Sequence, residues 1–267
     1  MQSILIKRPF HYPDFIIKTN NPRFASELKK IFRSYISEDD AGNEVMEIGV
    51  DFDGQTAKIT LDNKTWQSDD ALQEISNILY ENIHIINGIF AMHAAAVSIG
   101  DKSAVMTAPT GTGKTTLTTY LIHKGFDYLT DDCVFIDLAD FSVIPCGNDI
   151  HLREGGVEVL KQHHIQPKSI ERFEDETIQR FLFAPQNTIK EKKELGVILF
   201  LERCQENRVQ EISTSERLME LMKSPLTPYS IHREYLEFLR RLAQKPCMKL
   251  FYRDMDFVAD YLMGILL

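Results

Sequence analysis

The stretch TAPTGTGKTT (residues 107–116) follows an apolar run, SAVMT, and precedes a segment with helical apolar spacing, TTLTTYLIHKG. It satisfies the pattern G-x-x-x-x-G-K-[ST] except at its first position, where Ala108 replaces glycine. Gly111 and Gly113 permit positive-φ turns that bring backbone N–H groups close to an anion. The first position mainly needs a small residue at the strand exit, so we expect alanine to be tolerated. The stretch therefore predicts a strand, a phosphate-binding loop and a helix.

In such a loop, backbone N–H groups at the helix N-terminus hold the phosphates of a nucleotide. Lys114 would bridge the β- and γ-phosphates, and the Thr115 hydroxyl would be a ligand of Mg²⁺. The expected cofactors are therefore ATP and Mg²⁺. The expected nucleotide-binding residues are Ala108, Pro109, Thr110, Gly111, Thr112, Gly113, Lys114, Thr115 and Thr116.

Two adjacent carboxylates begin the next predicted strand, TDDCVFIDL. A carboxylate at a strand edge beside a phosphate loop is the usual place for a Mg²⁺ partner. A pair allows one carboxylate to hold the metal and the other to accept a proton from an attacking hydroxyl. Asp131 and Asp132 are therefore candidate catalytic residues, although an Asp-Asp turn is also common in loops.

Composition limits the remaining choices. The chain has 267 residues, of which 43% are hydrophobic and 26% charged, as in an ordinary globular protein. A formal net charge of -9 disfavours a broad nucleic-acid surface. The four cysteines form no C-x-x-C pair, which disfavours a zinc or dithiol site. No segment predicts a signal peptide or a membrane span, so we expect a cytoplasmic protein that binds neither nucleic acid nor membrane.

The chain is expected to divide into two parts. Residues 1–88 predict a small α+β module, in which EVMEIGVDF and TAKITLD alternate as strands do. Residues 89–267 contain the loop, a further core strand in GVILFLE and amphipathic helices in ERLMELMK, REYLEFLRRLAQ and MDFVADYL. Residues 69–90 predict a helix, and residues 163–180 a loop with a short helix. The first part carries no residues that suggest chemistry, so we expect it to serve as a scaffold or to recognise a substrate.

Residues 93–132, from HAAAVSIG through the loop to TDD, resemble the catalytic core of the HPr kinase/phosphorylase family. This family belongs to the superfamily that includes phosphoenolpyruvate carboxykinase. Its pattern is a histidine, a strand-turn-strand, the phosphate loop, a helix ending in glycine and a paired Asp. The matching positions, which align without gaps, are His93, Lys114, Thr115, Gly125, Asp131 and Asp132.

The resemblance implies an α/β (α+β) fold with the strongly curved mixed sheet of the HPr kinase C-terminal domain. It implies transfer of the γ-phosphoryl group of ATP to a serine hydroxyl of a peptide or protein. Asp132 would be the general base and Asp131 the metal ligand, or the reverse, and His93 would lie near the transferred phosphate. Arg153, in REGGV, is a candidate for contacting phosphate or substrate because guanidinium suits planar anions. Secondary candidates of the same kind are Arg180 and Arg203.

A short N-terminal module combined with this core of His93, the phosphate loop and the Asp pair looks more like the HPr-kinase-related enzymes of peptide-modification gene clusters. These include lasso-peptide kinases, which phosphorylate a serine near the C-terminus of a precursor peptide. The partner implied is a peptide or small protein with an acceptor serine. Two alternatives stay open: a nucleotide-binding regulatory module without transfer, and a kinase of small-molecule hydroxyls. The phosphoryl donor, the reverse reaction and the oligomeric state, including a homo-oligomer, are also open.

Overall fold

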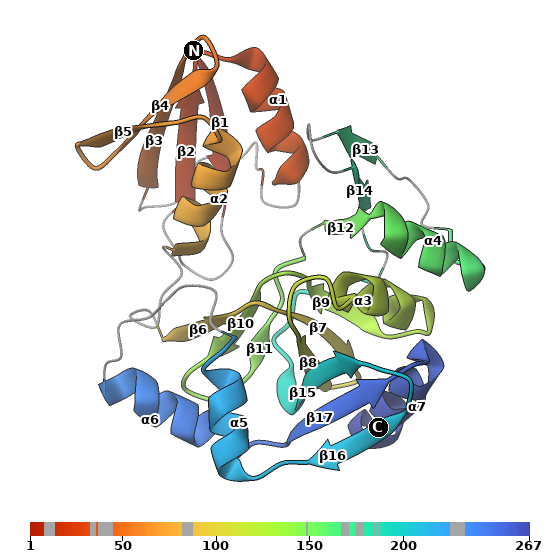
Figure 1. Ribbon diagram of the computed structural model, residues 1–267. Coiled ribbons are helices and arrows are strands. Elements are labelled where there is room, and N and C mark those ends of the chain that lie inside the picture. Colours follow the sequence, from red (N-terminus) through yellow and green to blue (C-terminus); the bar gives the residue numbers. More distant parts are fainter. Residues whose placement is uncertain are drawn as a thin grey trace. The chain divides into compact units, whose positions relative to one another are not determined.

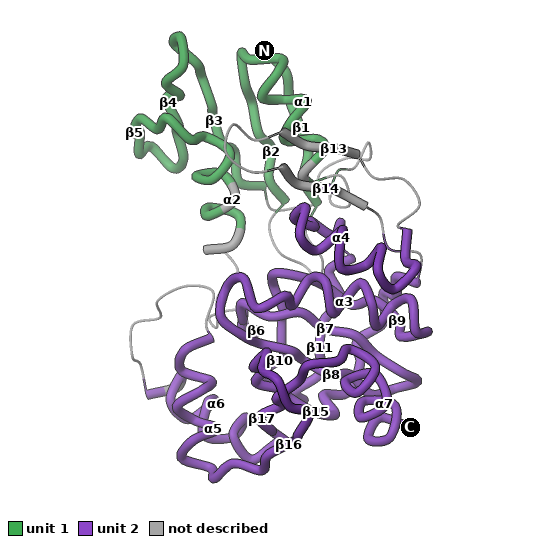
Figure 2. Tube along the Cα trace, turned by 45° about the vertical axis from the view of Figure 1, so that its right-hand side comes forward, with its two compact units in different colours: residues 1–83 green, residues 84–267 purple. Residues whose placement is uncertain are grey.

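The structure is a computed structural model that describes residues 1–7, 14–32, 36, 45–81, 88–147, 149–166, 171–174, 179–183, 185, 187–224 and 233–267. The chain divides into two compact units, Met1–Ile83 and His84–Leu267, which Figure 2 distinguishes by colour. The boundary expected from the sequence, between residues 88 and 89, lies a few residues further along the chain. Each unit is described by itself.

In the described part of unit 1, five strands form one sheet, accompanied by two helices (Figure 1). The strands are, in spatial order, β1 (Gln2–Ile6), β2 (Asp14–Thr19), β3 (Val45–Asp53), β4 (Thr56–Leu61) and β5 (Lys64–Ser68). The helices are α1 (Pro22–Ile31) and α2 (Ala71–Glu81). β2 and β3 are parallel and are joined through α1, whereas the other neighbouring strands are antiparallel. Alternate strand residues, such as Ala57 and Ile59, enter one apolar core.

Unit 2 is built on a mixed six-stranded sheet. Its strands are, in spatial order, β16 (Arg208–Glu211), β17 (Cys247–Tyr252), β15 (Glu194–Arg203), β8 (Lys102–Thr107), β7 (Ala94–Ile99) and β9 (Asp127–Thr130). β17, β15 and β8 are parallel to one another, and the outer pairings are antiparallel. The prediction of a mixed sheet around the phosphate loop is confirmed. Because three parallel strands end at the same edge, the segments that follow them meet there.

Two smaller antiparallel sheets complete the described strands of unit 2. One contains β6 (Ile89–Met92), β10 (Val134–Asp137) and β11 (Val143–Ile144), and the other contains β12 (Ile150–Arg153), β14 (Gln179–Phe183) and β13 (Glu171–Glu174). Both sheets correct the sequence-based expectations. Ile89 and Phe90 were expected in a helix but pair with β10, and β13 and β14 lie where a loop with a short helix was expected. Tertiary strand pairing overrides the local pattern in both places.

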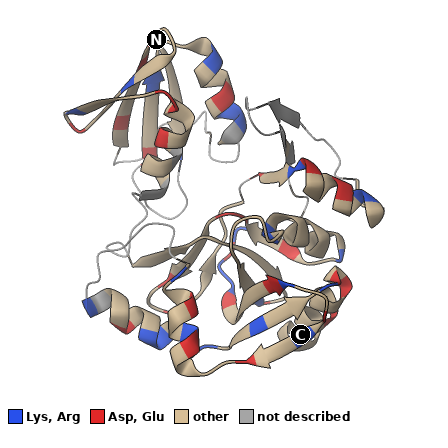
Figure 3. Cartoon of the chain, in the orientation of Figure 1, with Lys and Arg blue, Asp and Glu red and all other residues tan. Residues whose placement is uncertain are grey.

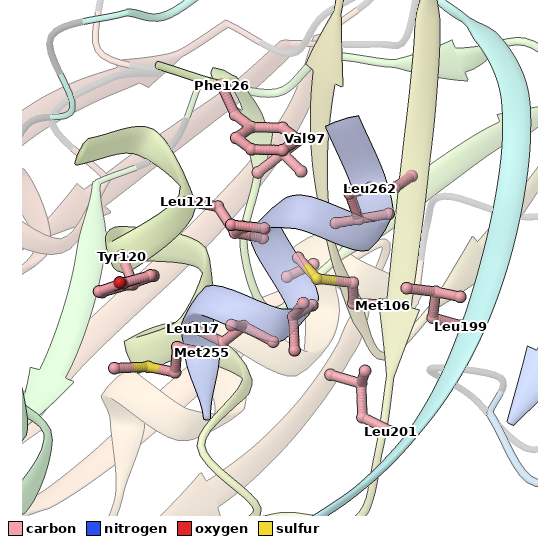
Figure 4. Packing of buried hydrophobic residues seen from close by; sticks show 14 of the residues in the cluster. Val97, Met106, Leu117, Tyr120, Leu121, Phe126, Leu199, Leu201, Met255 and Leu262 are labelled. Atoms are coloured by element: carbon pink, nitrogen blue, oxygen red, sulfur yellow. The ribbon is translucent and has the colours of Figure 1, made fainter. Parts of the chain in front are cut away.

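Two apolar cores cover the opposite faces of the six-stranded sheet. β15 shows the division, because Val197, Leu199 and Leu201 enter one core whereas Ile198 and Phe200 enter the other. The first core receives side chains from α3 (Lys114–His123), α4 (Glu154–Gln162) and α7 (Met255–Leu266). Figure 4 shows this core, with side chains of α3 and α7 gathered against those of the sheet. The second core receives side chains from α5 (Thr214–Leu221) and α6 (Arg233–Leu242).

Charged side chains of both signs are interspersed along the two units, as Figure 3 shows. All four cysteines are free thiols. Among the helices of the described residues, none combines the length and apolar character that crossing a membrane requires.

Candidate active site

The loop between β8 and α3 is a tight turn. Both the N–H and the hydroxyl of Thr112 donate to the carbonyl of Pro109, at 3.3 and 2.8 Å. Gly111 and Gly113 have φ values of 85° and 97°, in the region that side chains disfavour. Ala108 is not among the residues with positive φ. An alanine therefore fits the first position without backbone strain.

The loop leads directly into the N-terminus of α3. Gly113 is the N-cap residue, and no side chain of the described residues caps this helix end. The N–H groups of the first turn lack intrahelical acceptors in any α-helix, so here they can receive an anion. The hydroxyls of two threonines further along α3 make hydrogen bonds within the helix itself. Thr118 donates to the carbonyl of Lys114, and Thr119 donates to the carbonyl of Thr115. The start of α3 is therefore suited to binding phosphate.

The Lys114 side chain folds back over the loop. Its Nζ donates to the Ala108 carbonyl at 2.7 Å, and the residue is only 6% exposed. Burial lowers the pKa of Lys114, whereas the nearby carboxylates of Asp132 and Asp131 raise it. The amine thus stands between the loop and the acidic pair, where it can compensate negative charge on either side.

Asp131 and Asp132 follow the end of β9 and have different environments. Asp131 is 1% exposed, whereas Asp132 is exposed. Burial and the charge of Asp132 raise the pKa of Asp131 to about 8, and the nearby Thr115 side chain opposes this rise. A carboxylate and a hydroxyl expected to bind Mg²⁺ are therefore neighbours. A cation bound there would favour the ionised carboxylate and lower the pKa of Asp131.

The backbone at Asp132 is strained. Its φ is 63°, and the N–H of Cys133 donates to the carbonyl of Asp131 at 2.8 Å. These two features define a γ-turn with Asp132 at its centre, which is a rare and strained conformation. The hydroxyl of Thr130 donates to the Cys133 carbonyl at 2.7 Å and helps to hold the turn. Strained residues of this kind concentrate at functional sites.

His93 lies between β6 and β7 and contacts the same turn. Its Nδ1 is 3.1 Å from the main-chain carbonyl of Asp132. Because a carbonyl oxygen can only accept, Nδ1 must carry the proton, and in the neutral ring Nε2 is then an acceptor. The half-buried ring is therefore oriented by the backbone of the acidic pair.

One further contact with this region is not indicated by any local sequence pattern. The Ser224 carbonyl, just after α5, accepts the N–H of His93 at 2.8 Å. The Thr107 hydroxyl, at the end of β8, lies 3.2 Å from Ser224 Oγ and 3.3 Å from the His93 carbonyl. The end of α5 thus fixes both the histidine and the strand from which the loop starts. Ser224 lies far from both in the sequence, so no local pattern could identify it.

The structure places the candidate arginines at separate positions. Arg153 is exposed at the junction of β12 and α4. The start of α4 packs closely on α3, since a Cβ on Gly156 would lie only 2.7 Å from Thr116 Oγ1. Arg203 is exposed at the end of β15. The side chain of Arg180 lies outside the described residues. No hydrogen bond within the described residues joins Arg153 or Arg203 to the acidic pair.

The donor set fits Mg²⁺. The Thr115 hydroxyl and the Asp131 carboxylate supply hard oxygen donors, and Mg²⁺ is usually held by one or two carboxylates together with substrate phosphates. The described residues contain no group of three or more His, Cys, Asp or Glu side chains placed to hold a metal ion by themselves. A metal at this site would therefore bind together with the phosphates rather than in an all-protein cage.

Comparisons with known proteins add little to this geometry. The chain matches no family model and no curated protein sequence. Among solved structures it is similar to the Hpr(Ser) kinase/phosphatase from Coxiella burnetii, with 14% sequence identity and a TM-score of 0.33. The alignment covers 65% of this chain and 97% of that chain. A likeness of this size says nothing about the reaction.

Proposed function

We propose that this chain is an ATP- and Mg²⁺-dependent kinase that transfers the γ-phosphoryl group of ATP to a serine hydroxyl of a peptide or small protein. The observation that carries the proposal is the convergence of Thr115 and Lys114, at the start of α3, with the acidic pair at the end of β9. Binding a nucleotide would require the loop alone, whereas transfer to a hydroxyl also requires a proton acceptor beside it.

The proposed roles follow from the local environments. The loop and the N-terminus of α3 hold the phosphates, and Lys114 turns from the Ala108 carbonyl to the β- and γ-phosphates. Thr115 and Asp131 hold Mg²⁺, which supplies charge neutralisation at the transferred group. Asp132 is exposed, so it can meet an incoming hydroxyl, whereas Asp131 is buried. This difference favours Asp132 as the base and Asp131 as the metal ligand.

In the proposed reaction the serine oxygen attacks the γ-phosphorus, and the bond between this phosphorus and the β-γ bridging oxygen breaks. The hydroxyl proton passes to Asp132, and ADP leaves with the bridging oxygen. His93, oriented through Nδ1, places Nε2 where it can interact with the transferred phosphoryl group. Arg153 is proposed as a second cation near the substrate, because α4 starts against the first turn of α3.

The acceptor class rests on the resemblance of residues 93–132 to HPr kinases and their peptide-modifying relatives. We propose a serine near the C-terminus of a ribosomally made precursor peptide, such as a lasso-peptide precursor, as the acceptor. Unit 1 carries no member of the candidate site and is proposed to recognise the peptide.

The proposal is tested with purified protein, Mg²⁺ and γ-labelled ATP against a panel of serine peptides, including precursors encoded beside its gene. Asp132→Asn is the matched variant, because asparagine tolerates the positive φ of this position. Transfer by the wild type and its loss in Asp132→Asn would support the kinase and its base. ATP binding without transfer to any peptide would favour the regulatory module or a small-molecule acceptor.

A further inference from the structure

Tyr252, in β17, makes a hydrogen bond with the phosphate loop. It is the last residue of β17 and is 3% exposed. Its hydroxyl lies 3.3 Å from the carbonyl of Thr112, to which it donates. β15 separates β17 from β8 in the sheet, and Tyr252 pairs with Arg203, the last residue of β15. The contact therefore joins β17 to the loop that follows β8, a strand that is not its neighbour in the sheet.

The bond acts on one peptide group of the loop. The Thr112 carbonyl and the Gly113 N–H belong to the same planar trans peptide, so they point in opposite directions. Fixing the carbonyl towards Tyr252 therefore fixes the N–H on the side away from Tyr252. Gly113 has a φ of 97° and no side chain, so no side chain of its own restricts the rotation of this peptide. The hydroxyl of Tyr252 thus selects its orientation.

The surroundings keep the tyrosine hydroxyl able to donate. Burial raises the pKa of Tyr252, and the charge of Arg203, its partner across the β15–β17 pairing, lowers it. The ring packs in the same core as Leu250 and Leu201. The tyrosine oxygen is also close to Gly113, since a Cβ on this glycine would lie 3.9 Å from it, at ordinary van der Waals distance. The phenol is therefore held in place by apolar packing and directed at the loop.

We infer that Tyr252 is a positioning residue of the phosphate loop, which orients the Gly113 N–H towards the phosphates of the bound nucleotide. This inference rests on the proposed function, because it assumes that the loop binds nucleotide phosphates. Tyr252 itself does not contact the substrate in this arrangement. Its effect is expected on the affinity for phosphate groups and not on the binding of the nucleoside.

The test is Tyr252→Phe, which removes the hydroxyl and keeps the ring in the core. We expect the Kd of the variant for ADP to rise roughly three- to tenfold, which corresponds to the net free energy of one neutral hydrogen bond. Its Kd for adenosine should not change, since adenosine carries no phosphate. Tyr261→Phe, which removes the same atom from α7, serves as the control and should bind ADP like the wild type.

The outcomes separate the inference from the proposed function. An unchanged Kd for ADP in Tyr252→Phe overturns the positioning role while the nucleotide site stands. An equal loss of affinity for ADP and adenosine, together with a lower unfolding temperature of the ligand-free protein, also overturns it, because that result indicates a general structural role. A wild type that does not bind ADP at all overturns the proposed function and the inference with it.

Discussion

The ring of His93 donates a hydrogen bond from Nδ1 to the main-chain carbonyl of Asp132, over 3.1 Å. The same Asp132 lies at the centre of a γ-turn with a φ of 63°. Two residues that are far apart in the sequence are therefore linked by the side chain of His93 and the main chain of Asp132. This arrangement leaves both the Asp132 carboxylate and His93 Nε2 available for a substrate.

Two substitutions at His93 separate its structural role from its chemical role. In His93→Asn the side-chain amide can replace Nδ1 as the donor to the Asp132 carbonyl, but it cannot replace Nε2. We expect this variant to unfold like the wild type and to lose roughly 100-fold or more in kcat. His93→Ala should also lose about 1 kcal/mol of stability, because the carbonyl loses its partner. Urea denaturation and phosphoryl-transfer rates would measure the two effects, and full activity in His93→Asn would rule out a role for Nε2.

The buried acid Asp131 predicts a pH dependence of stability. Its pKa is raised from 3.8 to about 8 in the folded protein, so the folded state holds a proton that the unfolded chain releases at lower pH. The free energy of unfolding of the metal-free protein should therefore decrease as the pH rises from about 4 to about 8. Asp131→Asn should reduce this slope, because asparagine does not titrate. Urea denaturation at several pH values would measure it, and equal slopes in the two proteins would contradict the prediction.

The two adjacent glycines at the start of α4, Gly155 and Gly156, differ in the space available for a side chain. A Cβ on Gly156 would lie 2.7 Å from Thr116 Oγ1 and 3.2 Å from Leu152 Cδ2, whereas a Cβ on Gly155 would meet no atom within 4 Å. We expect Gly155→Ala to stabilise the protein by up to about 1 kcal/mol, because alanine is the better helix former. Gly156→Ala should be less stable than Gly155→Ala, since Thr116 and the first turn of α3 must shift. Thermal unfolding would compare them, and equal stability would show that α4 is not packed closely on α3.

Much of this region could be predicted from the sequence, because its signals are local. The glycines, Lys114 and the apolar runs on either side indicate a strand, a loop and a helix, and the structure contains β8 and α3 at these positions. Ala108 has no positive φ, so the backbone does not require glycine at the first position of the loop. The mixed sheet was implied only by the resemblance to a known family.

Other features depend on contacts between distant residues and could not be predicted. The bonds of Ser224 with His93 and Thr107, and the bond of Tyr252 with the loop, join segments that no periodic pattern relates. Ile89 and Phe90 were expected at the end of a helix over residues 69–90, whereas they begin the strand Ile89–Met92. A short apolar run fits both structures. Only its pairing with β10 decides between them.

The expected metal ligand Thr115 can be tested with two substitutions. Thr115→Ser retains the hydroxyl, whereas Thr115→Val keeps the shape and removes it. We expect Thr115→Val to lose roughly tenfold or more in kcat/KM with Mg²⁺ and ATP, about 1.4 kcal/mol of transition-state stabilisation. Thr115→Ser should retain most of the activity, and ADP binding without Mg²⁺ should be similar in all three proteins. Equal losses in both variants would argue against metal binding by this hydroxyl.

Phosphoryl transfer to a serine with Asp132 as the base predicts a fixed stoichiometry of products, which can be measured. ATP, Mg²⁺ and a serine peptide that binds the protein would be mixed with the wild type and with Asp132→Asn, and ADP and phosphoserine would be quantified over time. A kinase forms the two products in equal amounts, and Asp132→Asn should form both at least roughly 100-fold more slowly. ADP formed without phosphoserine, or equal rates in the two proteins, would contradict the claim.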